Sequence, residues 1–319
     1  MNAFCLHIAP AVKNCKKENN LKIWIQYIDK DNELEDSQMK HRLQYFLFAF
    51  TLLLSLSGCS SKQQNTGALI ETAQTKMSQI TSLQAKMNMD VNMTMGTEKV
   101  ATTTTADITA FIKPLKMKVE AASHIEGSTA KDTIMEMYLQ QNNGTFDLYT
   151  NTGTGWLHTQ GDKEKLGQFE VYDNMLSYLS AIENPVNKGS EKVGSVSTQR
   201  VEGILKGEVM KKIVEESGIL SSATSMGLSK ENLQKIYDET GGLPITLWIG
   251  EDGLVYQYKT DISKLIQVIM EKTLALMGID NTKNENSLSV EGATITMTCS
   301  EFNSVKEFDI PKEVLDTKK

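Results

Sequence analysis

The apolar residues of the first patterned segment repeat at helical spacing and then change to the alternation of a strand. From Ala68 to Leu83 they recur every three or four residues, which predicts an amphipathic helix with Thr66 as a candidate N-cap. From Lys86 to Met95 every second residue is apolar, and almost all of these are methionine. This alternation predicts a half-buried strand with a row of methionines on its apolar face.

The same alternation continues through short segments that are separated by turn residues. Pro114 separates two of these segments, and Asn143-Gly144 is a strong hairpin signal between two others. A succession of short strands joined by tight turns is typical of an antiparallel meander. The predicted strands after the first are 101–112, 115–122, 133–140, 145–150 and 155–160.

Helical periodicity returns after the meander and then alternates with further strand patterns. Apolar residues from Leu166 to Leu179 predict a helix at 163–182, which Pro185 is expected to end. A later helix at 229–240 has Ser229 as its predicted N-cap and Gly241-Gly242 as its stop. The other predicted elements are helices at 208–217 and 263–277, strand candidates within 191–206, a hairpin at 244–262 and a last strand at 287–302.

These elements predict one domain of the α+β class. Strands are interleaved with blocks of helix around a single meander, and no linker is rich enough in Pro or Gly to separate two domains. We therefore expect a single α+β domain over residues 67–319.

A different pattern precedes this domain. Met39-Lys40-His41-Arg42 is basic, Leu43 to Ser57 is mostly apolar, and Leu56-Ser57-Gly58-Cys59 ends the segment with small residues before a cysteine. This order is typical of a secretory signal. Its end resembles the lipobox of bacterial lipoproteins, in which cleavage between Gly58 and Cys59 leaves a cysteine that carries a diacylglycerol, with acyl chains such as palmitate.

The alternative interpretation of this apolar run is a plain membrane-spanning helix. The run has about 15 residues, whereas a span requires roughly 20. A diacylglycerol on Cys59 would anchor the protein stably, because two acyl chains bind a membrane firmly where one is marginal. We therefore interpret Cys59 as a membrane anchor and expect the domain on the outer face of the cell membrane.

The signal divides the rest of the chain. Residues 39–58 are the predicted signal peptide, and residues 59–66 are the lipidated cysteine with a flexible polar tether. Residues 1–38 carry mixed charges ahead of the signal, and we interpret them as an over-extended N-terminus with Met39 as the true start. The alternative, with Met1 as the start, is a cytoplasmic tail before an uncleaved anchor.

Composition limits the partners and the covalent chemistry. The chain has 33 Lys+Arg against 40 Asp+Glu, and Arg42 and Arg200 are its only arginines, which argues against a nucleic-acid partner. After loss of the signal and acylation of Cys59, Cys299 is the single remaining thiol. No intramolecular disulfide can then form, and we expect Cys299 to be a small buried apolar group.

Candidate catalytic residues are sparse. The two histidines of the domain, His124 and His158, have no partner at zinc-ligand spacing, and no Gly-rich phosphate loop or nucleophile elbow is present. Ser128-Thr129-Ala130-Lys131 matches the S-x-x-K motif of penicillin-binding proteins, but its companion motifs are missing. We expect no enzyme activity, no metal, and no cofactor beyond the covalent diacylglycerol on Cys59.

Methionine is the unusual residue type of the predicted meander. Flexible, polarizable thioethers form a surface that adapts to apolar ligands of variable shape. The alternative is that these side chains pack in an ordinary core beneath the helices, and periodicity does not separate the two. The candidate ligand-lining residues are Met87, Met89, Met93, Met95, Met117, Met135 and Met137.

Several segments together carry a family resemblance. They are the helix 68–83 leading into the methionine-rich strand, the run Met135-Glu136-Met137-Tyr138 with Tyr149 and Gly155-Trp156, and the ending from Glu301-Phe302-Asn303 to Phe308-Asp309-Ile310-Pro311. In these features the chain resembles lipoproteins of Gram-positive bacteria, in a family of unknown function related to LolA/LppX-type carriers of lipids and lipoproteins. The resemblance covers nearly all of residues 66–317. It implies a half-open, curved antiparallel barrel whose concave face is covered by helices, and it supplies no catalytic residues.

The leading hypothesis is a membrane-anchored extracytoplasmic lipoprotein that binds a lipid or another apolar ligand in a cavity between sheet and helices. The alternative is a non-catalytic interaction module that binds a protein partner of the cell envelope. The two differ in what lies opposite the methionines. The first requires a cavity, and the second a packed core with an exposed apolar patch elsewhere.

Overall fold

The computed structural model describes residues 66–129, 131–161, 179–216, 228–279, 281 and 287–318. Chain contacts divide the protein into two units, Met1–Arg42 and Leu43–Lys319, and every described residue belongs to the second. The predicted signal peptide, Cys59, the tether before Thr66 and most of the predicted helix 163–182 lie outside the described residues.

Strands account for most of the described chain. Their bounds are β1 (Ser82–Met95), β2 (Glu98–Phe111), β3 (Lys116–Ile125), β4 (Thr133–Asn142), β5 (Thr145–Asn151), β6 (Trp156–Gly161), β7 (Ile182–Val193), β8 (Val196–Leu205), β9 (Leu243–Gly250), β10 (Val255–Asp261) and β11 (Leu288–Ser300).

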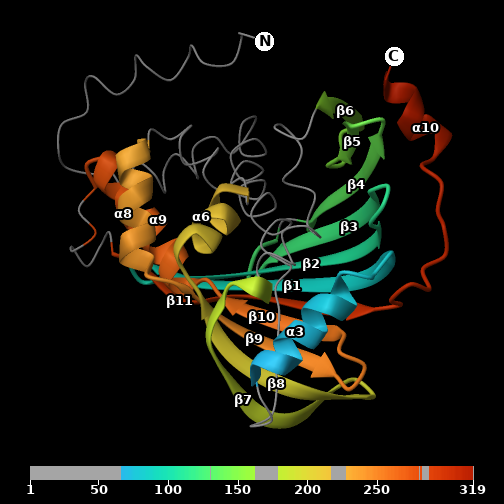
Figure 1. Ribbon diagram of the computed structural model, residues 1–319. Coiled ribbons are helices and arrows are strands. Elements are labelled where there is room, and N and C mark those ends of the chain that lie inside the picture. Colours follow the sequence, from blue (N-terminus) through green and yellow to red (C-terminus); the bar gives the residue numbers. More distant parts are fainter. Residues whose placement is uncertain are drawn as a thin grey trace. The chain divides into compact units, whose positions relative to one another are not determined.

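These strands form one large antiparallel sheet (Figure 1). The order of its 11 strands is β6-β5-β4-β3-β2-β1-β11-β10-β9-β8-β7, so the first and last strands pair at its centre. On one side of that pair, successive hairpins lead outward to the edge strand β6, and on the other side the strands β10, β9 and β8, with helices inserted between some of them, lead to the edge strand β7. The sheet is therefore open and curved rather than closed, which confirms the predicted fold class.

Helices cover this sheet mainly on one side, whereas the short C-terminal helices pack against the other side. The bounds are α3 (Thr66–Met77), α6 (Gly207–Glu216), α8 (Lys230–Thr240), α9 (Ser263–Leu276), α10 (Lys312–Leu315) and the 3-10 helix η3 (Asp316–Lys318). The helix α9 packs along β11, and α8 packs on α9. Met77 of α3, Ile236 of α8 and Leu265 of α9 are buried in the same core as the strand side chains, which places these helices over one face of the sheet.

Local signals in the sequence explain several element ends. Ser229 caps α8 as predicted, because its hydroxyl accepts a hydrogen bond from the backbone N–H of Asn232. Gly241 ends that helix in a left-handed conformation with a φ of 74°. Asn143 and Gly144 both have positive φ, which confirms the predicted tight turn between β4 and β5.

The structure corrects the prediction around Pro185. Ile182 does not end a helix but opens β7, and Pro185 lies within that strand. Because β7 is an edge strand with irregular pairing to β8 between Glu183 and Val186, a residue without an N–H is tolerated there. The strand candidates within 191–206 are resolved as the end of β7 and all of β8, with a turn at Gly194 (φ 59°).

Candidate apolar ligand site

Strand register brings all the candidate methionines to one face of the sheet, which we call the inner face. Residues that pair across neighbouring strands point to the same side. Met87 pairs with Ala106 on β2, Ala106 with Ala121 on β3, and Ala121 with Met135 on β4. The same registers place on this face the remaining candidates, Met89, Met93, Met95, Met117 and Met137.

Met297 belongs to the same face, although the sequence analysis did not single it out. It lies on β11 directly opposite Met87, and the hydroxyl of Tyr258 donates a hydrogen bond to its sulfur at 2.8 Å. The alternation of apolar residues within the predicted strand 287–302 already indicated that Met297 lies on an apolar face. What the sequence could not show is that the last strand of the domain pairs with the first.

Burial along the inner face is graded. Met87, Met89, Met117 and Met137 are buried in the main core. Met93, Met95 and Met135 are only half-buried, and they lie toward the end of the sheet where β1 turns into β2 and β3 into β4. We call the half-buried inner-face residues at this end the apolar rim: Met93, Met95, Val100, Ile125, Met135 and Val290.

Small side chains separate the methionines of β1 from those of β4. The hydroxyl of Thr104 donates a hydrogen bond to that of Ser123 across β2 and β3, at 3.1 Å. Both residues are buried, and this hydrogen bond gives each hydroxyl an uncharged partner. The small inner-face residues in the middle of these two strands are Thr104, Ala106, Ala121 and Ser123.

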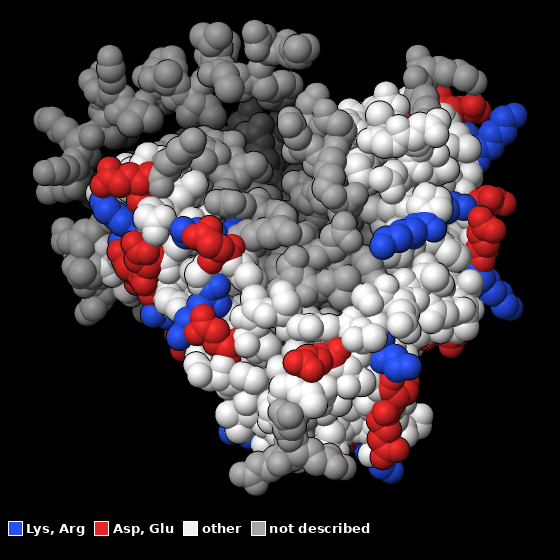
Figure 2. Space-filling view, in the orientation of Figure 1, with Lys and Arg blue, Asp and Glu red and all other residues white. Residues whose placement is uncertain are grey.

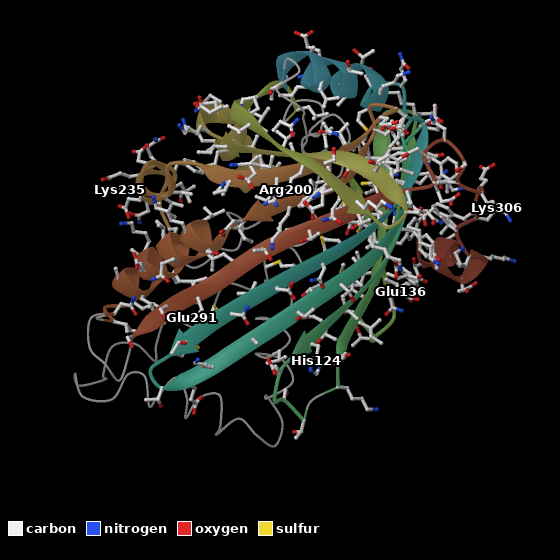
Figure 3. The ribbon with its side chains drawn as sticks, turned by 90° about the horizontal axis from the view of Figure 1, so that it is seen from below. His124, Glu136, Arg200, Lys235, Glu291 and Lys306 are labelled. Carbon is white, nitrogen blue, oxygen red and sulfur yellow. The ribbon has the colours of Figure 1, made fainter. Side chains whose placement is uncertain are left out.

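The opposite face of the sheet, which we call the outer face, carries the charges of these strands. Lys86 pairs with Asp107 at 2.6 Å, and Lys118 pairs with Glu120 at 2.8 Å, which raises the pKa of Lys118 through their hydrogen bond. His124 and Glu136 lie on the same face, as Figure 3 shows from below. The strands are therefore apolar on one side and solvated on the other.

Charge is also uneven over the described surface. In Figure 2, Lys, Arg, Asp and Glu gather over α8 and at the right-hand margin of the view, whereas the part over β4 to β6 carries few of them. Among residues 66–318 that are described, no three His, Cys, Asp or Glu side chains come together in a way that could hold a metal ion.

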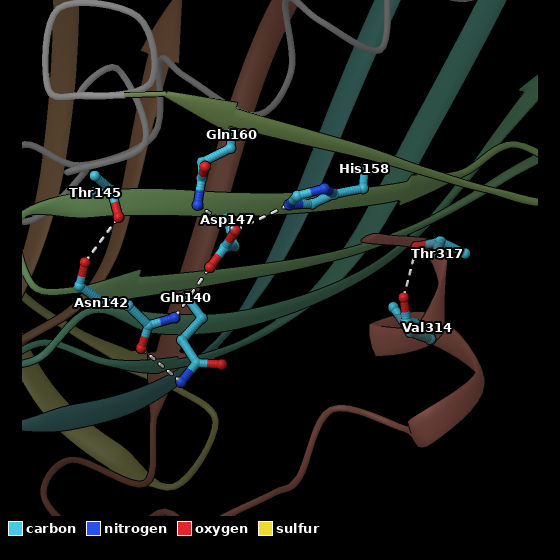
Figure 4. Close-up of polar contacts among 8 residues, drawn as sticks. All are labelled: Gln140, Asn142, Thr145, Asp147, His158, Gln160, Val314 and Thr317. Carbon is cyan, nitrogen blue, oxygen red and sulfur yellow. Dashed lines mark hydrogen bonds and ion pairs between the residues drawn. The ribbon is translucent and has the colours of Figure 1, made fainter. Parts of the chain in front are cut away.

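A buried carboxylate lies on the outer face near the β6 edge (Figure 4). Asp147 of β5 is 2% exposed, and its Oδ1 lies 2.9 Å from His158 Nε2 and 3.2 Å from Gln160 Nε2, both on β6. Its Oδ2 accepts a hydrogen bond from Asn142 Nδ2 at 3.0 Å. We call this set the Asp147 node. Sequence reasoning missed it, because its members come together only through strand pairing.

An aromatic cluster continues from this node along the outer face. The ring of His158 stacks on Tyr149 with centroids 4.8 Å apart, and Tyr138 lies 5.5 Å from Trp156. Burial raises the pKa of Tyr138 above its ordinary value. The cluster is completed by Ile310 and Val314 of the C-terminal segment, for which the sequence analysis predicted no helix.

The other predicted residues are placed as follows. Cys299 is buried, as expected, and burial raises the pKa of its thiol to about 12, so it remains an uncharged apolar group. Cys59 and Gly58 lie outside the described residues. Of the helices that the structure describes, none combines the length and the apolar character needed to cross a membrane.

Comparisons with known proteins give a partial family match and several similar folds. The model of a family of unknown function, DUF6612, matches residues 65–174. No curated protein matches the chain.

Among solved structures, the chain is similar to the lipoprotein LppX of Mycobacterium tuberculosis, with 15% identity and a TM-score of 0.40 over 76% of this chain and 98% of that one. It is similar to LprF of Mycobacterium bovis, with 16% identity and a TM-score of 0.41 over 77% and 96% of the two chains. A LolA superfamily protein of Nitrosomonas europaea matches at 9% identity and a TM-score of 0.23, over 77% and 95%. A Gram-positive origin of the chain stays a prediction.

Proposed function

We propose that the protein is a non-catalytic extracytoplasmic lipoprotein, anchored to the outer face of the membrane through a lipidated Cys59, that binds a lipid or another apolar ligand. The proposed site is a cavity between the inner face of the sheet and the segments that cover it. The ligand would lie against the methionines of β1, β3 and β4.

The continuity of the inner face carries this proposal. A methionine row that served only as a core would be expected to end where burial ends. Here the row continues from buried Met87 and Met89 to half-buried Met93 and Met95 on the same strand. An apolar chain could therefore reach the core along this row of methionines.

The chemistry of the inner face defines the class of ligand. From Leu83 to Met93 and across the paired positions of β2 to β4, the inner-face residues are apolar or carry a neutral hydroxyl. A charged group placed there would lose its hydration without gaining a partner. Thioethers and small side chains instead favour an acyl chain or a similar flexible apolar group.

A pair of neighbouring substitutions tests this proposal. Met135 lies on the inner face at the rim, and Ile134 beside it points to the outer face and is 60% exposed. Met135→Lys should weaken binding of cis-parinaric acid, a fluorescent fatty acid, by about tenfold or more, because it places an ammonium group on the apolar surface. Ile134→Lys is the matched control and should bind like the wild type in a fluorescence titration of the full-length protein.

Two outcomes would contradict the proposal. If Met135→Lys binds the probe as tightly as Ile134→Lys does, the inner face is not the site. If the stable wild type binds no fatty acid at all, the proposal is wrong. That result would favour the alternative that the protein is an interaction module for an envelope partner.

A further inference from the structure

The C-terminal segment after β11 starts from a fixed point on the first strand. The backbone N–H of Asn303 donates a hydrogen bond to the carbonyl of Ser82 at 2.8 Å. The side-chain Oδ1 of Asn303 accepts hydrogen bonds from the backbone N–H and the hydroxyl of Thr81, at 2.6 and 3.0 Å. Residues 301–318, which we call the strap, are thereby attached at one end to the start of β1.

The middle of the strap crosses the outer face over β2 to β4. The ring of Phe308 lies 6.0 Å from Phe111 and 6.3 Å from Tyr138, measured between centroids. Lys116 Nζ lies 4.9 Å above the Phe308 ring and 3.7 Å from the carboxylate of Glu307. Side chains, rather than a ladder of strand hydrogen bonds, provide these contacts.

The end of the strap reaches the free edge of the sheet. Ile310 and Val314 are buried against Tyr138 and Tyr149, and η3 contacts the edge strand β6 (Figure 1). The backbone hydrogen bonds of α10 are local, such as that from the N–H of Val314 to the carbonyl of Pro311. The strap thus spans the outer face from β1 to β6, with two buried aliphatic side chains as its distal anchors.

The strands beneath the strap also form part of the inner face. Tyr138, which the strap covers, lies between Met137 and Leu139, which point into the main core. On β5, Tyr149 follows Leu148, which packs against that core. A rigid sheet transmits a change on one face to the other, because successive side chains share one backbone.

The hairpin β5–β6 is therefore held from outside by two attachments. The Asp147 node ties β6 to β5 and to the β4–β5 turn (Figure 4), and the strap ties both strands to the centre of the sheet. An edge hairpin of six- and seven-residue strands would otherwise be among the least stable parts of such a sheet.

We infer that the strap is a clamp that controls access of the apolar ligand to the inner face by fixing the β4–β6 edge from the outer face. When Ile310 and Val314 leave the aromatic cluster, the β5–β6 hairpin keeps only its ladder of strand pairs to β4 and moves more freely, and the inner face opens at that edge. The inference rests on the proposed function, since it concerns the regulation of the same site.

Two adjacent residues of α10 provide the test. Val314 is 1% exposed within the cluster, whereas Leu315 is 38% exposed. Val314→Ser should speed amide hydrogen exchange in β5 and β6 of the full-length protein by about tenfold, because it removes a buried aliphatic anchor. Exchange in β9 and β10 should not change. Association of cis-parinaric acid should become several-fold faster, and Leu315→Ser should match the wild type in both measurements.

The outcomes separate the clamp from the proposed function. If the wild type binds the probe and Val314→Ser loosens β5 and β6 without changing the association rate, the clamp is wrong and the ligand site stands. If the wild type binds no probe, the proposed function fails first. Phe308→Leu, which keeps an apolar side chain over Tyr138, provides a milder variant with the same expected direction should Val314→Ser not fold. An unchanged association rate in that variant would also overturn the clamp.

Discussion

Single-residue alternation separates two kinds of chemistry in this sheet. Met135 and Met137 point into the core side, while Glu136 between them points to the solvated outer face. On β5, the hydrogen-bonded carboxylate of Asp147 and the core side chain of Leu148 likewise point to opposite faces, although Asp147 is buried. A shift of one residue in strand register would bury charges and expose the methionines, so the pattern fixes the register strongly.

Asp147→Asn tests the stabilising role of the buried node. The amide would keep the size of the side chain but could not accept hydrogen bonds at both ends from His158, Gln160 and Asn142. We expect a loss of about 1–3 kcal/mol in the free energy of unfolding, measured by urea denaturation. Asp107→Asn is the matched control, because that carboxylate is exposed and paired with Lys86, and should cost about 0–1 kcal/mol. Equal losses in the two variants would show that burial of Asp147 adds nothing.

At the scale of elements, the turn between β9 and β10 packs against α3. Gly253 has a φ of 82°, and a Cβ there would lie 3.0 Å from side-chain carbons of Lys76 and Thr72 on α3. Gly144, in the β4–β5 turn, has almost the same φ of 83° but open space around it. The two glycines therefore share a left-handed backbone conformation and differ in the contact with a helix.

Gly253→Ala should consequently destabilise the protein more than Gly144→Ala. Each variant should lose roughly 1 kcal/mol from the left-handed backbone, and Gly253→Ala should lose more because the side chains of Thr72 and Lys76 must make room for the new Cβ. Chemical denaturation of both variants measures the difference. If the two losses are the same, α3 does not pack closely against this turn.

Most elements of the sheet could be predicted from the sequence, because period-two alternation and turn residues such as Asn143-Gly144 are local signals. The β7 strand could not, since Pro185 is tolerated only through its place at a sheet edge. The strap could not either, because the burial of Ile310 and Val314 depends on Tyr138 and Tyr149, which are distant in sequence. The sequence could predict that the methionines of β1 share one face of the strand. It could not predict how deeply each is buried, because burial depends on which strands and helices lie beside β1, including β11.

At the scale of the whole described domain, the open sheet has two faces of different composition. Pairing of the first strand with the last joins the two arms of the sheet into one continuous inner face. The described helices α8 and α9 pack over the β11 side of that face, and the strap secures the β6 side from the outer face. We therefore propose that the inner face binds the ligand and that the outer face controls access to it.

Native mass spectrometry of the full-length gene product, purified from the envelope of its own host, tests the central claim most directly. We expect an apolar lipid to co-purify with the wild type at a defined stoichiometry. The same lipid should be absent from the Met135→Lys variant and present on the Ile134→Lys variant. The mass of the denatured chain reports, in the same experiment, whether it was cleaved and acylated at Cys59. A stable, folded protein that carries no lipid and takes up none would contradict the account.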